Sequence, residues 1–297
     1  MPSAMAGQIR GSLNAFRDAP PPATIEESRA RLEALISLMP PLPDLQVEAV
    51  DIDGIRGEWL SPPGAASERV ILYLHGGAYS VGSIATHRDL SSRIAAAGGV
   101  CALVIDYRLA PEHPFPAALE DAVLAYRWLL KKGFNPSRII VSGDSAGGGL
   151  ALALLLSLRA SGDPLPAGAA LLSPWTDLTV SGESARTRAA VDPMIAPHQI
   201  LPAGQMYLGS ADARNPLASP VFADLHGLPP LLIHVGNDET LLDDSARVAR
   251  NAYEAGVDVT LRVASGMWHV WHASAGVMPE AQLAVDEIGA FVKQRMG

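Results

Sequence analysis

The residue of this sequence best placed for chemistry is Ser145, in the pentapeptide Gly143-Asp144-Ser145-Ala146-Gly147. A β-branched run over 138–142 precedes the pentapeptide, and an Ala/Leu-rich run over 146–161 begins within it. Gly-x-Ser-x-Gly between a strand and a helix predicts a nucleophile elbow, a sharp turn that holds the serine hydroxyl clear of the backbone. Such a serine needs a base, an acid that orients the base, and an oxyanion hole. Without those groups, Ser145 is only a loop serine between glycines.

An oxyanion hole is predicted in His75-Gly76-Gly77-Ala78, which follows the apolar run 70–74. Glycines after a strand can simply turn the chain, but an oxyanion hole requires backbone N–H groups that no side chain obstructs. His75 stands at the start of this loop, where we expect a structural role. The expected oxyanion hole comprises Gly76, Gly77, Ala78 and Ala146, with Gly76 shaping the turn and the other three donating N–H groups.

The acid should follow Ser145 in the chain and stand at the end of a later strand. The apolar run 231–235 ends in Gly-Asn-Asp-Glu-Thr, residues 236–240. We expect Asp238 to be the acid. Asp243 and Asp244 lie further on, in the first turns of an expected helix, where the helix dipole explains acidic residues.

The base should be a histidine in the loop after the last strand, and two histidines stand there, His269 and His272. His269 is nearer to the strand end and is the preferred base, with His272 as the alternative. Two histidines at this spacing can bind a metal ion on a helix, but no third ligand cluster accompanies them, so we expect no metal site. Surface or packing positions are expected for the other histidines, His87, His113, His198, His226 and His234.

Short apolar runs alternate with helical patterns, which predicts a mostly parallel α/β sheet covered by helices on both faces. Only Gly54 separates the first two strands, so we expect them to form an antiparallel hairpin at one edge. The eight expected strands are 46–53, 55–60, 70–74, 100–106, 138–142, 168–172, 231–235 and 257–263. The expected helices are 86–97, 117–131, 146–161, 240–255 and 279–295.

Two regions do not fit this alternation. Residues 1–45 contain one expected amphipathic helix, 24–39, with Leu32, Leu35, Ile36 and Met39 on one face. Residues 179–216 are too long for a simple crossover and contain a short expected helix at 197–208. Both regions are either irregular surface excursions or a lid over the carboxyl edge of the sheet, where open α/β sheets bind ligands. Long irregular segments in compact domains are usually functional, which favours the lid.

Residues that line the substrate pocket are harder to assign. Four side chains near the expected lid could contact an acyl chain, although helical Met and aromatic residues more often belong to the core. These four are Trp175, Met206, Tyr207 and Leu208.

The sequence resembles the hormone-sensitive lipase-like carboxylesterases, or bacterial family IV esterases, of the α/β-hydrolase fold. The resemblance runs from about residue 45 to the C-terminus and implies a central eight-stranded, mostly parallel sheet with a helical cap. Three positions depart from the family pattern: Ala78 replaces a glycine, Glu239 a proline, and Val270-Trp271 replaces Gly-Phe. The matching stretches are residues 75–78, 106–112 (Asp-Tyr-Arg-Leu-Ala-Pro-Glu), 143–148, the segment around Asp238, and 266–269 (Gly-Met-Trp-His).

This resemblance implies four segments and one chemistry. Residues 1–45 form an N-terminal cap segment, 46–178 and 217–297 form the two parts of the hydrolase core, and 179–216 form a cap insertion. The expected activity is hydrolysis of short- to medium-chain acyl esters by a Ser145-His269-Asp238 triad through an acyl-enzyme, without metal or organic cofactor. A lactone hydrolase or small-molecule deacetylase would use the same triad. A non-catalytic receptor on this fold is disfavoured, because such receptors have lost the histidine that His269 supplies.

Charge and composition disfavour nucleic acid and the membrane interior as partners. The formal net charge is −9 and no basic patch is apparent, so we expect no nucleic-acid partner. The apolar run 150–158 is too short to span a bilayer, and the first ten residues show no secretory signal, so we expect a cytoplasmic protein with no integral membrane association. The single cysteine, Cys101, excludes an internal disulfide. An open edge at the last strand would allow a homodimer.

Overall fold

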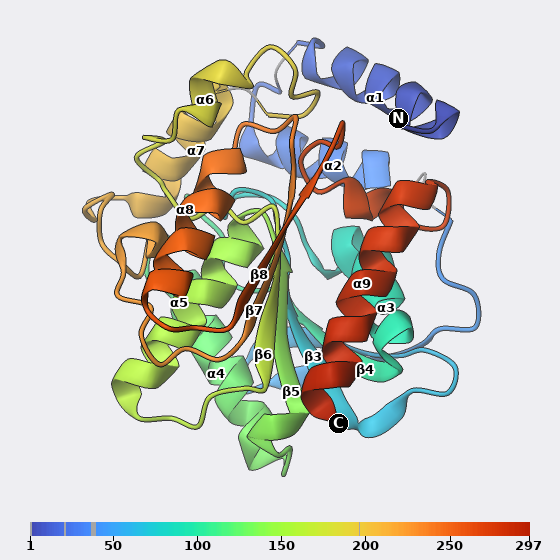
Figure 1. Ribbon diagram of the computed structural model, residues 1–297, viewed down its shortest axis with the longest axis vertical. Helices are drawn as coiled ribbons and strands as arrows, with labels where there is room; N and C mark the ends of the chain where they lie inside the picture. Colours follow the sequence, from blue (N-terminus) through green and yellow to red (C-terminus); the bar gives the residue numbers. More distant parts are fainter. Residues whose placement is uncertain (1, 21, 37–39, 196) are drawn as a thin grey trace.

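The computed structural model describes residues 2–20, 22–36, 40–195 and 197–297. A twisted eight-stranded sheet crosses the described part of the chain, with helices on both faces (Figure 1). Its strands are β1 (Gln46–Ile52), β2 (Ile55–Ser61), β3 (Ala66–Leu74), β4 (Val100–Ile105), β5 (Ile139–Asp144), β6 (Gly168–Leu172), β7 (Leu231–Gly236) and β8 (Val259–Ala264).

The helices alternate with these strands as the sequence pattern predicts. The described ranges also contain three one-turn 3₁₀ segments, η1 (Pro136–Arg138), η2 (Pro220–Phe222) and η3 (Trp271–Ser274). The α-helices are α1 (Ala4–Arg17), α2 (Ile25–Ile36), α3 (Ile84–Gly98), α4 (Ala117–Lys131), α5 (Ala146–Ser161), α6 (Ser184–Thr187), α7 (Pro197–Leu208), α8 (Leu242–Glu254) and α9 (Pro279–Met296).

The strand order is β1-β2-β4-β3-β5-β6-β7-β8, which confirms the predicted α/β-hydrolase fold. β1 and β2 form the expected antiparallel hairpin, and β2 also pairs antiparallel with β4. From β4 to β8 every neighbouring pair is parallel. The strands from β3 to β8 therefore end at the same edge of the sheet.

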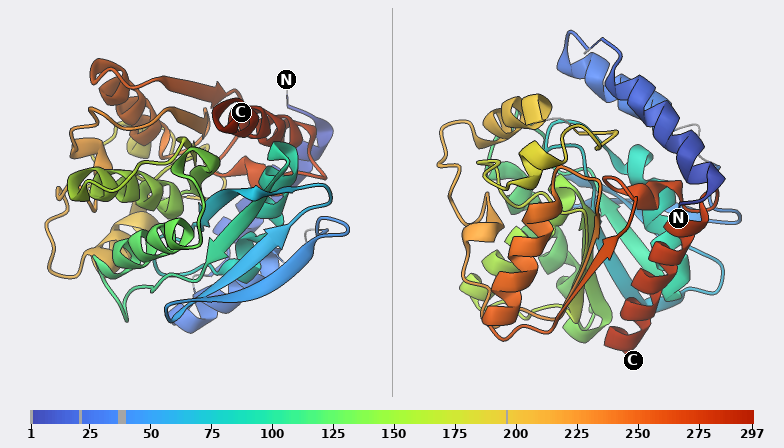
Figure 2. Two further views of the ribbon diagram at one scale, coloured as in Figure 1. Left: turned by 90° about the horizontal axis from the view of Figure 1, so that it is seen from below. Right: turned by 45° about the horizontal axis from the view of Figure 1, so that its top comes forward.

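Helices cover the two faces unequally, and each face has its own apolar core. α3 and α9 pack on one face, where Ile94 and Ile288 are fully buried. α4, α5 and α8 pack on the other, where Tyr126, Leu154 and Val248 are fully buried. Figure 2 shows the sheet between these two layers from two further directions. β4, β5, β6 and β7 are buried along their whole length, and burial on both faces explains why β4 and β6 are continuous apolar runs.

The carboxyl edge of the sheet carries the loops with the predicted site residues. β3 leads into the His-Gly-Gly-Ala loop, β5 into Ser145, β7 into the acidic pair 238–239, and β8 into His269. α1, α2, α6 and α7 lie across this same edge, at the top of Figure 1. Both regions that interrupt the alternation thus cover the edge where ligands bind in this class of fold.

The prediction of a single N-terminal helix was wrong, because α1 precedes α2. Ser3 caps α1, and the apolar residues Ile9 and Leu13 pack against the core. Gly7 and Gly11 lower the helix propensity of this segment and hid its helical spacing. The predicted helix 24–39 corresponds to α2, and residues 37–39, with Met39, lie outside the described residues.

Smaller differences concern element ends. α8 begins at Leu242 rather than 240, β8 begins at Val259 rather than 257, and the one-turn helix α6 was not predicted.

Among the described residues, none of the helices combines the length and the apolar character that a bilayer-spanning helix requires.

The contact between α3 and α9 allows a stability test at Gly289. A Cβ at this position would lie 2.5 Å from the carbonyl carbon of Ala97, a backbone atom that cannot turn aside. We expect Gly289→Ala to lower the free energy of unfolding by about 1–3 kcal/mol. Gly11→Ala is the matched control, because a Cβ there meets nothing within 4 Å; it should be neutral or stabilise by up to about 1 kcal/mol. Chemical denaturation measures both, and a Gly289→Ala protein as stable as the wild type would refute the packing argument.

Candidate active site

Ser145 occupies the junction between β5 and α5 in a conformation that residues other than glycine rarely adopt. Its φ is 52° and its ψ −123°, a strained geometry that costs on the order of 1–3 kcal/mol. Three backbone contacts impose the strain: Ser145 N–H donates to Leu172 O at 2.8 Å, and Ser145 O accepts from Trp175 N–H at 2.8 Å and from Gly149 N–H at 3.1 Å. The side chain is half-buried. The local geometry is that of a nucleophile elbow.

The glycines after Ser145 are required by close approach of the backbone. A Cβ at Gly147 would lie 2.0 Å from Leu74 O, and a Cβ at Gly149 would lie 2.0 Å from Trp175 O. The first turn of α5 therefore lies directly against the ends of β3 and β6. This contact explains three consecutive glycines in a helix that propensity alone would disfavour.

The carboxylate beside His269 belongs to Glu239 and not to Asp238, the acid that the sequence predicts. Glu239 Oε2 lies 2.9 Å from His269 Nδ1, and both side chains are buried. Asp238 faces away and pairs with Arg10 of α1 at 2.9 Å, at a site where both side chains are about a quarter exposed. Two adjacent acids in one turn point in different directions, and strand spacing alone did not distinguish them.

Glu239 is held rigidly by groups on three loops. Its Oε1 accepts hydrogen bonds from the Ser173 hydroxyl at 2.8 Å and from the Gly236 N–H. The Ser173 hydroxyl in turn accepts from Val270 N–H at 3.1 Å. Ser173, fully buried at the end of β6, thereby joins the acid loop to the histidine loop. The sequence analysis missed Ser173; its place directly after a buried strand at the carboxyl edge was the available signal.

The carboxylate determines both the tautomer and the proton affinity of His269. A carboxylate can only accept, so His269 Nδ1 carries the proton and Nε2 remains as the acceptor site of a neutral ring. Burial lowers the pKa of His269, but the hydrogen bond to Glu239 and the charges of Glu239, Asp192 and Asp144 outweigh it and raise the pKa above its ordinary value. The site therefore stabilises an imidazolium, as a general base requires.

The alternative base, His272, has different surroundings. Its Nε2 lies 3.2 Å from His234 Nδ1, and the Trp271 ring packs against it with a centroid distance of 3.9 Å. Burial and the neighbouring His234 and His269 hold the pKa of His272 well below 6.5. No carboxylate among the described residues orients this ring. The geometry thus favours His269.

His75 behaves as a structural residue, as expected. Its ring stacks on Tyr107 at 4.2 Å and its Nδ1 lies 2.7 Å from Gly76 O. Burial lowers the pKa of His75 to about 3, so the ring is neutral at ordinary pH.

In the predicted oxyanion loop, Gly76 fixes the turn, and the residues after it are the candidate hydrogen-bond donors. Gly76 N–H donates to the buried Asp144 carboxylate at 3.1 Å, and a Cβ at Gly76 would lie 2.2 Å from that carboxylate. Gly77 has a φ of 115° and Ala78 a φ of 53°, which is costly for alanine. Among the described residues, the N–H groups of the three other predicted members, Gly77, Ala78 and Ala146, have no hydrogen-bond acceptor within the protein.

Asp144, the residue before Ser145, holds this loop in place through hydrogen bonds of its buried carboxylate. Its carboxylate accepts from the Tyr73 hydroxyl at 2.8 Å and lies 3.3 Å from His87 Nε2. Burial disfavours the charged carboxylate, but His87 and Tyr73 outweigh burial and lower the pKa of Asp144. Asp144 therefore remains an anion that fixes the loop between β3 and α3.

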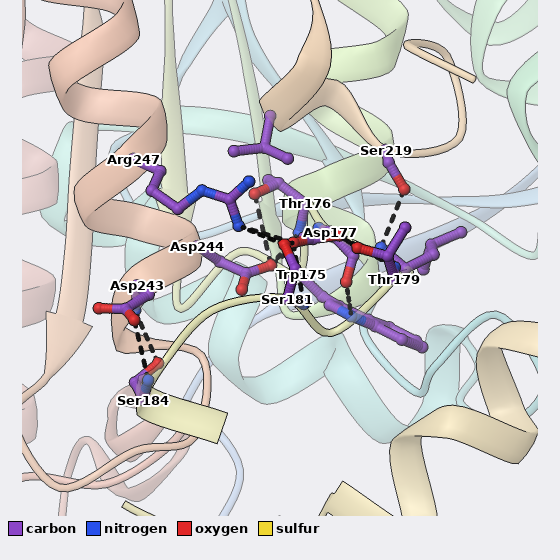
Figure 3. Close-up of polar contacts among 12 residues, drawn as sticks. Trp175, Thr176, Asp177, Thr179, Ser181, Ser184, Ser219, Asp243, Asp244 and Arg247 are labelled. Carbon is purple, nitrogen blue, oxygen red and sulfur yellow. Dashed lines mark hydrogen bonds and ion pairs between the residues drawn. The ribbon is translucent and has the colours of Figure 1, made fainter. Parts of the chain in front are cut away.

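The structure places three of the four expected pocket residues in the core. Tyr207 stacks on Tyr79 at 3.6 Å, and Trp175 packs beside Tyr79. The Trp175 indole N–H donates to Asp177 O at 3.1 Å (Figure 3). Leu208 is buried in the same cluster, and Met206 packs against it half-buried. The packing interpretation therefore describes Trp175, Tyr207 and Leu208 better than the pocket interpretation.

A hollow of about 420 Å³ lies instead between α2 and the oxyanion loop. Arg29 closes one side of it, with hydrogen bonds to Ser80 O at 3.0 Å and to Glu112 at 2.8 Å. His75, Tyr107 and Leu109 also line it. None of the four predicted pocket residues does.

A polar cluster anchors the start of the segment 179–216 to α8 (Figure 3). The buried Asp177 carboxylate accepts from Ser181 Oγ at 2.6 Å and from Arg247 at 2.6 Å. Asp244 Oδ2 accepts from the N–H groups of Thr176 and Asp177 at 2.7 and 2.8 Å, and burial raises the pKa of Asp244 to about 7.

Within the described ranges no cluster of His, Cys, Asp and Glu is arranged to hold a metal ion.

Comparison with known proteins agrees with this fold. Residues 71–273 match the model of a family with the α/β-hydrolase fold. An acetyl-hydrolase of Streptomyces hygroscopicus is 45% identical over 84% of this chain and 83% of the relative, and an esterase of Acinetobacter venetianus is 38% identical over 89% and 87%. The crystal structure of an esterase from the bacterial hormone-sensitive lipase family superposes with a TM-score of 0.97, at 46% identity and full coverage of both chains.

The contact between Glu239 and His269 predicts a measurable proton affinity. The pKa of His269 should lie above 6.5, and Glu239→Gln should lower it by about 1–3 units, because burial then dominates. Asp238→Asn is the matched control and should leave this pKa within about half a unit, because a partly exposed pair is weak. NMR titration of the imidazole measures all three proteins. The opposite ranking of the two variants would show that Asp238 is the orienting acid.

Proposed function

Because the chain belongs to the hormone-sensitive lipase-like esterases of the α/β-hydrolase fold, we propose that Ser145, His269 and Glu239 form its catalytic triad. The protein is a hydrolase of carboxylic ester bonds, and its substrates are small-molecule esters. The observation that carries the proposed triad is the buried 2.9 Å contact between His269 Nδ1 and Glu239 Oε2, on the same sheet edge as the strained Ser145. We expect short- to medium-chain acyl groups, because the sequence has no broad apolar stretch of the kind with which a lipase binds a lipid surface.

The proposed reaction has two half-reactions. His269 Nε2 takes the proton of the Ser145 hydroxyl as Oγ bonds to the ester carbonyl carbon, and the carbonyl π electrons move onto oxygen. The N–H groups of Gly77, Ala78 and Ala146 stabilise that oxyanion, and Glu239 stabilises the imidazolium. The tetrahedral intermediate expels the alkoxide, which receives the proton from His269.

The second half-reaction repeats these steps with water as the nucleophile. His269 removes a proton from water, the hydroxide oxygen bonds to the acyl carbon, and the bond from that carbon to Ser145 Oγ breaks. The serine oxygen regains the proton from His269, and the carboxylic acid leaves. His269 is the residue that accepts and returns the proton in each step of this scheme.

An acetyl ester is the more specific candidate substrate. The relative from Streptomyces hygroscopicus is named an acetyl-hydrolase, as is a relative 39% identical to this chain from Mycobacterium tuberculosis. A panel of acetyl, butyryl and octanoyl esters with one leaving group, together with lactones and acetylated amines, distinguishes a deacetylase from a general esterase.

We infer that residues 1–45 and 179–216 act together as a cap on the two-part core formed by 46–178 and 217–297. Arg10 of α1 contacts the backbone of Val191 and the acid loop, and Arg29 of α2 contacts the loop after β3. These contacts tie the N-terminal segment both to the insertion and to the loops of the site.

A homodimer through β8 is a further proposal. β8 lies at the sheet edge, and Val263 on it is 49% exposed, with Tyr253 and Leu283 exposed on the adjoining helices. Gel filtration that gives only monomer at micromolar concentration would remove this proposal.

A cytoplasmic location stays a prediction. The lack of a nucleic-acid partner also stays a prediction, which the net charge of −9 supports.

Ser145→Ala should lower kcat on a p-nitrophenyl ester by at least about 10³-fold, because no nucleophile remains. A fluorophosphonate should label the wild-type protein at Ser145, which peptide mass spectrometry locates, and should not label the variant. Retained activity, or labelling at another serine, would refute the proposed nucleophile.

Activity should decline as pH falls, because a protonated His269 cannot accept the serine proton. Since the pKa of His269 is raised, the midpoint of the acid limb of kcat/KM should lie above pH 6.5. A pH–rate profile on protein that stays folded throughout the range checks this expectation. A flat profile from about pH 5 to 8, with chemistry limiting, would contradict a histidine base.

A further inference from the structure

A carboxylate from the cap insertion reaches the acid loop of the proposed triad. Asp192 follows Val191, which is 43% exposed, yet the Asp192 side chain is completely buried. It belongs to the stretch 188–195, which lies between α6 and α7 over the carboxyl edge of the sheet. A buried acid in an otherwise irregular surface segment calls for an explanation in terms of its contacts.

Both carboxylate oxygens of Asp192 accept backbone hydrogen bonds. Oδ2 accepts from Thr240 N–H at 2.7 Å, and Oδ1 accepts from the N–H groups of Met194 and Ile195 at 2.9 and 3.0 Å. The Thr240 hydroxyl donates back to Ile195 O at 3.0 Å. Thr240 directly follows Glu239, so Asp192 fixes the acid loop at the residue next to the proposed acid.

The charge of Asp192 has no cation opposite it among the described residues. Arg17 of α1 contacts this residue, but it donates to the backbone oxygen of Asp192 at 2.6 Å. Arg10 likewise donates to Val191 O at 3.0 Å. Two arginines thus hold the loop backbone in place and leave the carboxylate with neutral N–H donors alone. A buried carboxylate without a counter-ion is costly, and a neutral asparagine could not satisfy the same three donors.

The charged groups around His269 show where this buried charge acts. Glu239, Asp192 and Asp144 all raise the pKa of the ring, and burial opposes them. His272, which also acts on His269 electrostatically, is itself held neutral by burial. Asp238, the nearest other acid in the loop, is paired with Arg10.

We propose that Asp192 is a positioning residue that holds the Glu239 loop through Thr240 and supplies a buried negative charge, in addition to that of Glu239, which stabilises His269 when it carries the serine proton. The inference rests on the proposed triad. It makes the cap insertion part of the proton-transfer machinery, since displacement of the stretch 188–195 would remove both the hydrogen bond to Thr240 and the charge.

The test compares Asp192→Asn with Asp243→Asn. Asp243 also ties the insertion to the core, because its Oδ2 accepts from Ser184 N–H of α6 at 2.8 Å (Figure 3). Unlike Asp192, whose carboxylate accepts from Thr240 N–H, the Asp243 carboxylate accepts no backbone hydrogen bond from residues 236–240 among the described residues. Asp192→Asn should lower kcat roughly 10- to 100-fold with KM within about 3-fold, and should move the acid limb of kcat/KM to lower pH by about half a unit or more. Asp243→Asn should keep kcat within about 3-fold, with the acid limb unmoved.

Two further measurements keep the outcomes distinct. Arg17→Met loosens the loop without removing the carboxylate and should lower kcat in the same direction but less, which covers the case in which Asp192→Asn does not fold. Fluorophosphonate labelling of wild-type Ser145 tests the triad separately: absence of labelling refutes the proposed function itself. Normal labelling together with wild-type kcat and pH limb in Asp192→Asn, or equal losses in both Asn variants without a pH shift, would overturn the role of Asp192.

Discussion

The hydrogen bond between the buried Glu239 and His269 is the interaction on which the rest of the site depends. A carboxylate removed from water is costly unless its oxygens accept hydrogen bonds, and both oxygens of Glu239 do so here. Ser173 and Gly236 hold one oxygen, so the other has only the imidazole to bind. That division fixes the ring tautomer and leaves Nε2 as the proton acceptor.

Meeting this requirement shapes the loops at the carboxyl edge of the sheet. The donors come from the ends of β6 and β7 and from the loop after β8, which can converge only because parallel strands end at one edge. A second buried acid, Asp144, fixes the oxyanion loop on the other side of Ser145 in the same manner. Asp192 extends the pattern to the insertion. Buried carboxylates, each satisfied by neighbouring loops, thus connect the core, the proposed triad and the segments above it.

Sequence reasoning captured the features that follow from local patterns. Short apolar and β-branched runs that alternate with helical patterns predicted the eight strands. The elbow and the His-Gly-Gly-Ala loop were predicted from their local residue spacing at the ends of two of these strands. His269 was favoured over His272 by its distance from the strand end. The choice between Asp238 and Glu239 could not be made this way, because both stand in one turn and only the position of Arg10, over two hundred residues away, shows which acid faces outward.

The other misses have similar causes. α1 carries glycines that weaken its pattern, and its packing depends on partners such as Glu280, which is distant in sequence. Trp175 and Tyr207 looked like pocket residues because aromatic side chains near a cap are ambiguous until their neighbours are known. Ser173 and Asp192 have no local motif at all; their roles arise from hydrogen bonds between loops that only the folded chain brings together.

The identity of the acid is the central claim, and steady-state kinetics on the two neighbouring acids tests it most directly. We predict that Glu239→Gln lowers kcat/KM on a short-chain p-nitrophenyl ester by about 10³- to 10⁴-fold, while Asp238→Asn keeps it within about 10-fold. A large loss in Asp238→Asn with near wild-type kcat/KM in Glu239→Gln would contradict the account.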